Sequence, residues 1–244
     1  MPPTLTDHRS LGKRPPVAYA VDVMSFVRAH SPEQREVRRT TILDTARAML
    51  DEMPVAEITL NGLSRKSCMA KSNVLRYFES REAILLELCA EALEEWVIDL
   101  EAKLSDGMSS SDPAPVRADR IVAVITTSLA ERPVLCDLMS SQASVLEHNI
   151  STGTVLAFKR ASIANISRLT DMVARHLPEL GAENAGRFTR LAALMATSVW
   201  THSHAPQAVV AAYEADPSLQ PYQLVFETTL AEALDVIMAG LLSR

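Results

Sequence analysis

Apolar residues recur along this chain at the spacing of helix faces rather than in the strict alternation that is typical of strands. The first well-marked apolar stripe consists of Ile42, Leu43, Ala46, Met49 and Leu50. Ser31, Pro32 and Gln34 precede this stripe in the order of a helix cap, a first helical residue and a capping box. Because Pro54 follows the stripe, we expect a helix that begins after Ser31 and ends before Pro54.

Helices are also expected over most of the remaining chain. Thr59 is a natural cap for a second helix, a turn at Cys68 leads into a third, and Ser80 caps a long fourth helix that ends near Leu104. A loop follows at 107–115, and prolines then divide the chain into helices at roughly 116–130, 133–148, 152–177, 183–204 and 222–242. The pattern predicts an all-α protein with about nine main helices.

Composition agrees with this fold class. Only 7 of the 244 residues are glycine, and a hydrophobic fraction of 48% with 22% charged residues is typical of a well-packed soluble protein. No uncharged apolar run reaches the roughly 18 residues of a membrane span, and the N-terminus has no apolar signal core. Cys68, Cys89 and Cys136 lie far apart, which favours reduced thiols over disulfides or a zinc site. We expect a cytoplasmic protein without a cofactor or a metal.

The formal net charge of −6 is unevenly distributed. Residues 1–78 hold 12 Lys/Arg and 8 Asp/Glu, a balance of +4, whereas the rest of the chain holds 12 and 22, a balance of −10. A basic end on an acidic body favours contact with nucleic acid phosphates at one pole only.

Candidate chemistry is densest between Thr59 and Leu85, where two short helices meet at a tight turn. Lys71, Ser72 and Asn73 open the second of these helices, and small polar and basic side chains at the start of a short, anchored helix suit the major groove of DNA. The Asn73 amide can form two hydrogen bonds with an adenine edge. Lys71 and Arg76 can approach guanine acceptors or phosphates.

From about Arg39 to Leu88 the chain resembles the DNA-binding part of the TetR family of bacterial transcriptional regulators. The family order of a Thr cap, a tight turn, a small polar helix start, a Tyr–Phe pair and a following helix is matched by Thr59, Ser67-Cys68-Met69, Ala70-Lys71-Ser72-Asn73, Leu75-Arg76-Tyr77-Phe78 and Ser80-Arg81. Three positions depart from it. Cys68 replaces a turn glycine, Ala70 a capping Ser or Thr, and Leu75 a Tyr that touches the DNA backbone in the family.

The resemblance implies a three-helix helix-turn-helix domain followed by a larger helical domain for ligand binding and dimerisation. We divide the chain into a partly flexible N-terminal extension (1–30), a DNA-binding domain (31–80) and a helical body (81–244). The residues expected to contact DNA are Arg38, Arg39, Thr59, Lys71, Ser72, Asn73, Arg76, Tyr77 and Arg81. In the extension, Arg9, Lys13 and Arg14 form a candidate arm for the minor groove, the alternative being a tail without a role.

Two reading helices are normally needed to bind an operator, which predicts a homodimer. The expected interface consists of Leu191, Ala192, Met195, Leu230, Leu234, Ile237 and Leu241, with the alternative that these stripes face the chain's own core. In the family a cavity in the body binds the effector. Aromatic and Met side chains that could line it for a small hydrophobic effector are Trp96, Met139, Phe158, Met172, Met195 and Trp200, and plain core positions are again the alternative. His202 and His204 lie two positions apart on a helix and do not form a metal pair.

The chain is therefore predicted to be a sequence-specific DNA-binding transcriptional regulator. The resemblance implies a homodimeric repressor that a small-molecule effector releases from a palindromic operator. The alternative is a DNA-binding regulator or architectural protein without a small-molecule ligand. An enzyme is disfavoured, because the sequence has no Gly-rich phosphate loop, no GxSxG and no HExxH.

Overall fold

The structure is a computed structural model that describes residues 31–243. The predictions for the N-terminal extension (1–30) and for its basic arm lie outside this range. Between residues 31 and 243 the chain forms ten α-helices and no strand, which confirms the all-α class. None of these helices is both long and apolar enough to cross a membrane.

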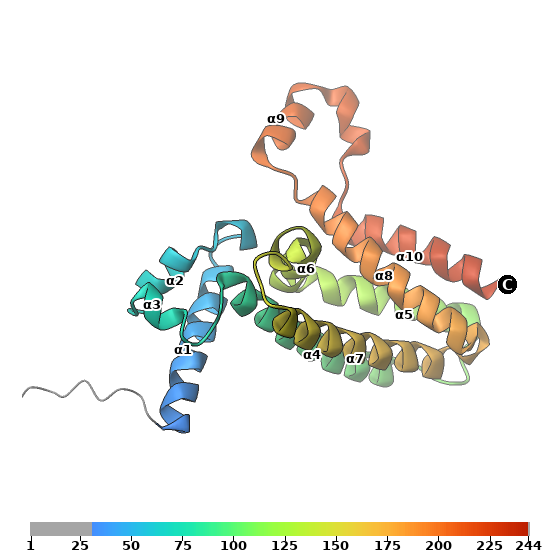
Figure 1. Cartoon of the computed structure of the whole chain (residues 1–244). Coiled ribbons are helices and arrows are strands. Elements are labelled where there is room, and N and C mark those ends of the chain that lie inside the picture. Colours follow the sequence, from blue (N-terminus) through green and yellow to red (C-terminus); the bar gives the residue numbers. More distant parts are fainter. Residues whose placement is uncertain (1–30, 244) are drawn as a thin grey trace, which may run out of the picture.

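Three helices and a 3-10 turn make up residues 31–80, which we call the head (Figure 1). They are α1 (Pro32–Leu50), the turn Val55–Glu57, α2 (Leu60–Lys66) and α3 (Lys71–Val74). The Ser31 hydroxyl oxygen accepts a hydrogen bond of 3.2 Å from the Gln34 N–H, and the Thr59 hydroxyl oxygen accepts one of 3.0 Å from the Gly62 N–H. Both predicted caps are thereby confirmed.

Residues 81–243, which we call the body, form the remaining helices. They are α4 (Arg81–Gly107), α5 (Ala114–Ala130), α6 (Pro133–Ser141), α7 (Thr152–His176), α8 (Gly181–Ser203), α9 (Gln207–Ala215) and α10 (Phe226–Leu242). Ser80 caps α4 as predicted, because its hydroxyl oxygen accepts a 3.2 Å hydrogen bond from the Ala83 N–H. The helix expected over 133–148 is interrupted, since α6 ends at Ser141 and Gln142–Leu146 continue as a π-helix.

Helix α9 was not predicted. It lies between α8 and α10 and is followed by the 3-10 helix Pro217–Tyr222. Pro206, Pro217 and Pro221 lie between the helices predicted at 183–204 and 222–242, and nine residues between the first two of these prolines are helical. Figure 1 shows this segment standing out from the body on the side where α8 and α10 lie.

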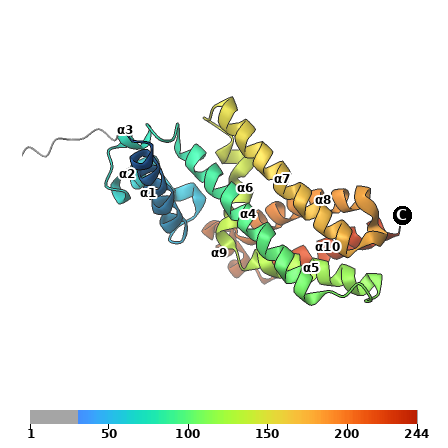
Figure 2. The same ribbon diagram turned by 90° about the horizontal axis from the view of Figure 1, so that it is seen from below.

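The buried apolar side chains form two clusters. One, the body cluster, joins the second half of α4 to α5, α7, α8 and α10. The other, the head cluster, joins α1, α2 and α3 to the first half of α4, and it also contains Leu138, Leu146 and Phe158 from the body. Figure 2 shows that α4 runs from the head along the body, so that one helix serves both clusters. The head core therefore extends beyond residue 80.

Most of the predicted dimer seam faces the chain's own core. Within the single chain Leu230 and Leu234 are fully buried, and Ala192 and Leu241 are nearly so. Their stripe is the most apolar face of the two helices, and that face packs inward within one chain. Of the other three, Leu191 is exposed, while Met195 and Ile237 are partly buried against the body cluster.

Candidate functional site

The turn between α2 and α3 presents the start of α3 to solvent. Lys71, Ser72 and Asn73 are all exposed, whereas Val74 on the same helix is fully buried in the head cluster. Phe78 is also buried there, as expected of a core residue. The short helix is thus anchored by one face and offers its polar N-terminal residues to a partner, which is the geometry that a major groove accepts.

Two of the three departures from the family pattern have a structural counterpart. Cys68, which stands where the family has a turn glycine, has φ +54°, the left-handed conformation that glycine adopts without a steric penalty. Ala70 caps α3 without a side-chain hydrogen bond. Leu75, at the third position, is exposed at the end of α3.

The arginines predicted to contact DNA differ in their surroundings. Arg39 pairs with Glu87 of α4, and its guanidinium carbon lies 5.0 Å from the centre of the Phe78 ring. The Arg81 guanidinium donates to the Ile58 carbonyl oxygen and, over 2.8 Å, to the Glu82 carboxylate. Both side chains therefore brace the junction of the head with α4.

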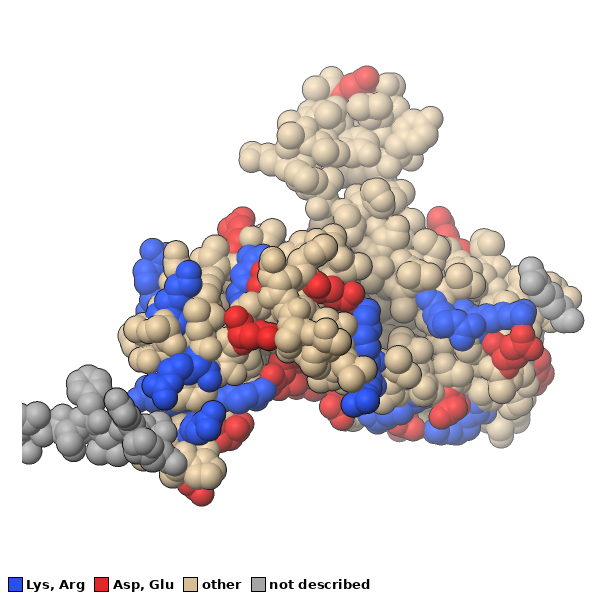
Figure 3. All heavy atoms as spheres, in the orientation of Figure 1, with Lys and Arg blue, Asp and Glu red and all other residues tan. Residues whose placement is uncertain are grey.

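The remaining predicted DNA contacts are freer. Arg38, Lys71 and Arg76 are exposed and form no ion pair with any residue between 31 and 243. Thr59 accepts a hydrogen bond as a helix cap, and its hydroxyl hydrogen remains available for a phosphate. Tyr77 is partly buried against the head cluster. On the face drawn in Figure 3, Lys and Arg side chains lie over the head, and others lie over the body among Asp and Glu side chains.

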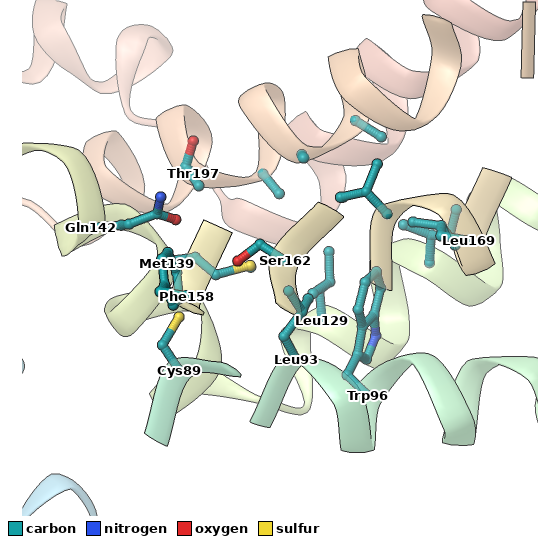
Figure 4. A pocket seen from close by; sticks show the side chains of 15 residues that line it. Cys89, Leu93, Trp96, Leu129, Met139, Gln142, Phe158, Ser162, Leu169 and Thr197 are labelled. Carbon is teal, nitrogen blue, oxygen red and sulfur yellow. The ribbon is translucent and has the colours of Figure 1, made fainter. Parts of the chain in front are cut away.

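A cavity of about 180 Å³ lies inside the body, enclosed by α4, α5, α7, α8 and the α6–π-helix segment (Figure 4). Its lining comprises Cys89, Leu93, Trp96, Ile125, Leu129, Met139, Gln142, Phe158, Ser162, Ile166, Leu169, Ala192, Ala193, Ala196 and Thr197. None of these side chains is charged. The cavity therefore suits an apolar ligand, or an apolar part of one, with few hydrogen-bonding groups.

Half of the predicted ligand contacts line this cavity, namely Trp96, Met139 and Phe158. The other three do not line it: Met172 is buried in the body cluster, Met195 packs against that cluster, and the Trp200 ring stacks on His204 with 3.6 Å between ring centres. Sequence reasoning missed most of the lining. The α7 contribution could have been found, since Phe158, Ser162, Ile166 and Leu169 recur at one helix face.

Polar groups at the cavity are few. The Trp96 indole N–H donates to the Ser128 hydroxyl over 2.9 Å, and the Gln142 amide donates to Glu147 over 2.6 Å. The Ser162 hydroxyl is buried and has no hydrogen-bond partner among residues 31–243. Burial raises the pKa of the Cys89 thiol to about 12, so this cysteine stays protonated and acts as an apolar wall.

The cavity wall and the head cluster share side chains. Cys89 and Phe158 line the cavity and belong to the head cluster, and Met139 packs against both clusters. A carboxylate also crosses the junction from the body, where Asp137 of α6 accepts a 2.7 Å hydrogen bond from the Val55 N–H. A change in the shape of the cavity would therefore press directly on the packing of the head.

Comparison with known proteins supplies the family context. A family model described as "Tetracyclin repressor-like, C-terminal domain" matches residues 90–244. A comparison with curated proteins finds no match. Among solved structures, FadR from Thermus thermophilus, a TetR family transcriptional repressor in complex with lauroyl-CoA, is 18% identical with a TM-score of 0.51, and the alignment covers 84% of this chain and 93% of that one.

Two further solved structures share the fold. The fatty acid degradation regulator FadR from Bacillus halodurans is 11% identical with a TM-score of 0.50, over 83% of this chain and 95% of that one. A putative transcriptional regulator from Pseudomonas aeruginosa PAO1 is also 11% identical with a TM-score of 0.50, over 85% and 91% of the two chains.

Proposed function

Because the chain belongs to the tetracycline repressor-like (TetR) family of transcriptional regulators, we propose that it is a homodimeric repressor of a palindromic operator. In this proposal the two heads bind adjacent major grooves, and an apolar effector in the body cavity releases them. The proposed domains are the DNA-binding head (31–80) and the ligand-binding and dimerisation body (81–244).

Operator recognition is assigned to the exposed start of α3. Asn73 reads an adenine edge, and Lys71 and Arg76 bind guanine acceptors or phosphates. Ser72, Thr59 and Arg38 are suited to the DNA backbone, where contacts fix the register without reading sequence. Tyr77, Arg39 and Arg81 act mainly by holding the head in place, because their side chains already pack or form hydrogen bonds within the chain.

The proposed dimer interface is the outer face of α8 and α10. Leu191 and Leu194 of α8 are 41% and 65% exposed, and Val236 of α10 is 74% exposed. Large aliphatic side chains in such positions favour a covered face. Pairing two copies through α8 and α10 would bury all three and set the spacing of the two heads.

The proposed effector is a molecule with a long apolar chain. The uncharged lining of the cavity supports this choice. The lauroyl-CoA bound to Thermus thermophilus FadR makes acyl thioesters the first class to test. The acyl chain would enter the cavity, while the charged nucleotide part would remain outside it, since burying unpaired charge is costly.

The observation that carries the release mechanism is the shared wall of Cys89, Phe158 and Met139. A ligand against these residues favours one arrangement of the head cluster over another. If that arrangement spaces the two heads wrongly for the operator, binding the effector and binding DNA oppose each other.

The proposal is tested by selecting operators from random duplexes with the full-length protein and measuring affinity by fluorescence anisotropy. We expect enrichment of a palindrome and weaker binding when lauroyl-CoA is added, with no effect of free coenzyme A. Failure to enrich any palindrome would contradict the function. Enrichment without a response to apolar compounds would favour a DNA-binding regulator that has no small-molecule ligand.

A further inference from the structure

The polar groups of the body cavity lie toward one side of it. In the view of Figure 4, Gln142, Ser162 and Thr197 lie toward one end, whereas Leu93 and Trp96 lie toward the other. The three polar residues come from three different elements, namely the π-helix, α7 and α8. A ligand that fills the cavity therefore meets apolar side chains at one end and hydrogen-bonding groups at the other.

Ser162 interrupts an otherwise apolar face of α7. It lies one turn after Phe158 and one turn before Ile166, and all three residues line the cavity. The Ser162 hydroxyl oxygen is buried and has no hydrogen-bond partner among residues 31–243. A buried hydroxyl without a partner destabilises the fold, so an alanine would suit a plain core position better. The hydroxyl therefore calls for a partner from outside the chain.

Other hydroxyls in the body helices are satisfied within the chain. Thr126 donates a 2.9 Å hydrogen bond to the Val122 carbonyl oxygen, and Thr170 of α7 donates one of 2.9 Å to the Ile166 carbonyl oxygen. Such a bond to the preceding turn is common for a hydroxyl inside a helix. The Ser162 hydroxyl forms no such bond and is directed into the cavity instead (Figure 4). Its hydrogen is thus free to be donated to a bound molecule.

The neighbouring polar groups already donate hydrogen bonds within the chain. The Thr197 hydroxyl donates to the Leu194 carbonyl oxygen over 2.9 Å, and the Gln142 amide donates to the Glu147 carboxylate over 2.6 Å. Glu147 is in turn paired with Lys159, so the charge behind the amide is compensated. None of the residues that line the cavity is cationic. A free carboxylate in this cavity would therefore be buried without a counter-charge, which is strongly unfavourable.

We propose that Ser162 determines which effectors the cavity accepts, by donating its hydroxyl hydrogen to a neutral acceptor oxygen of an otherwise apolar ligand. The inference rests on the proposed effector site in the body. The carbonyl oxygen of a ketone, an ester or a thioester is an acceptor of this kind. A hydrocarbon leaves the hydroxyl unpaired, and a free acid brings an uncompensated charge. The cavity therefore selects neutral carbonyl compounds over both.

The selection is tested by titrating the full-length protein with three small probes of similar length. They are 2-octanone, 2-methyl-1-octene, in which a methylene group replaces the carbonyl oxygen, and octanoate. Trp96 lines the cavity, so a change in tryptophan fluorescence reports binding. We expect the wild-type protein to bind the ketone about tenfold more tightly than the alkene, and octanoate the most weakly of the three.

The variant Ser162→Ala should lose this preference, because the affinity for the ketone falls to that for the alkene while the alkene binds as well as before or better. Ser167→Ala, at an exposed serine of the same helix, is the matched control and should keep the wild-type preference. Circular dichroism checks that both variants are folded. A role of Ser162 in packing alone would change both affinities in the same proportion and leave their ratio unaltered.

Three results would overturn the inference while the effector cavity and the repressor proposal stand. They are equal wild-type affinities for the ketone and the alkene, a preference that survives Ser162→Ala, and octanoate binding as tight as that of the ketone. A wild-type protein that binds none of the three probes would overturn the inference together with the effector cavity. Selection of operators from random duplexes then judges the DNA-binding proposal separately.

Discussion

Glu79 of the head is bound to Thr154 of the body, because its carboxylate accepts a 2.5 Å hydrogen bond from the Thr154 hydroxyl. The same carboxylate oxygen accepts a 2.9 Å hydrogen bond from the Ser151 N–H at the start of α7. Helix α7 lines the cavity further along its length, and Glu79 directly follows the Tyr77–Phe78 pair of the reading segment. The pair joins the end of the head to the first turn of α7, one turn before Phe158 of the cavity wall.

Glu79→Gln should weaken the response of the protein to its effector. The amide keeps an acceptor oxygen but loses the charge that strengthens these hydrogen bonds at a helix N-terminus. We expect near-normal operator affinity without effector and a smaller change when lauroyl-CoA is added. Anisotropy titrations of both states measure this, with Glu57→Gln, another exposed acid of the head, as the control. An undiminished effector response would show that the contact carries no coupling.

The Glu79 contact should also depend on pH. The hydrogen bond from Thr154, followed by that from Ser151, lowers the pKa of Glu79 below its ordinary value of 4.5. A lowered carboxyl pKa means that the contact is fully present above the ordinary value and is lost as the pH falls through the lowered one. NMR titration of the Glu79 side-chain carboxyl should therefore give a midpoint below 4.5 that rises in Thr154→Ala.

Asn73 and Arg76 should differ in the kind of DNA binding they support. Asn73→Ala should lose about 1–3 kcal/mol of discrimination at one base position, because a two-bond contact to a base edge is removed. Arg76→Ala should weaken all duplexes and reduce the slope of log affinity against log salt by about one, if its main contact is a phosphate. Operator and scrambled duplexes are compared at several salt concentrations. Equal losses on both duplexes for Asn73→Ala would refute base reading.

Filling the cavity should separate effector response from DNA binding. Ala196 of α8 lines the cavity, and Ala196→Leu adds three carbon atoms to its wall. We expect operator binding to survive and the response to lauroyl-CoA to weaken by about tenfold or more, because the volume for the apolar chain is occupied. Ala182→Leu, at an exposed position of the same helix, is the matched control and should respond like wild type.

Leu194→Glu should separate the subunits. A carboxylate at this exposed position would be desolvated against the second copy, which costs several kcal/mol when the charge stays unpaired. We expect a monomer in sedimentation at micromolar concentration and a loss of operator binding. Ile98→Glu places the same charge on α4, away from α8 and α10, and should remain dimeric. A dimeric Leu194→Glu protein would show that the interface lies on another face of the chain.

The free energy of unfolding should depend on which side chain occupies position 68 in the turn. Cys68→Gly removes the penalty of a side chain at positive φ, about 1–2 kcal/mol, and loses part of this gain to the greater freedom of glycine when unfolded. We expect stability equal to or slightly above that of wild type. Cys68→Val should destabilise by about 1–3 kcal/mol, because a β-branched residue fits this conformation poorly. Urea unfolding measures both, and a neutral valine variant would contradict the strain.

Local features were predictable from the sequence wherever a short stretch determines its own geometry. The caps at Ser31, Thr59 and Ser80 need only one hydroxyl and the next three residues, and all three are confirmed. The conformation of Cys68 followed from the resemblance, because the family turn places glycine there. The all-α class could also be predicted, because the spacing of apolar residues on each helix face is visible within a short stretch of sequence.

Features that depend on which faces meet were not predictable. Helix α10 carries apolar residues on two sides, and the stronger stripe through Leu230 and Leu234 packs inside the chain while Val236 points outward. Periodicity alone cannot say which of two stripes meets the chain's own core. The cavity likewise forms where the side chains of five elements meet without filling the space between them, and the sequence does not show where these elements meet. Met172 and Trp200 had suitable chemistry for its lining, but both are buried in the body cluster instead.

Because the head core continues past residue 80, the head and the body cannot be separated or exchanged at that residue without exposing buried side chains. Cutting the chain after Ser80 would strip the head of Ile84, Leu85 and Leu88 from α4 and of Phe158 from α7. A chimeric protein that joins this head to another ligand-binding domain would therefore have to include the first two turns of α4 as well. It would also need a receiving scaffold whose own aromatic side chain takes the place of Phe158.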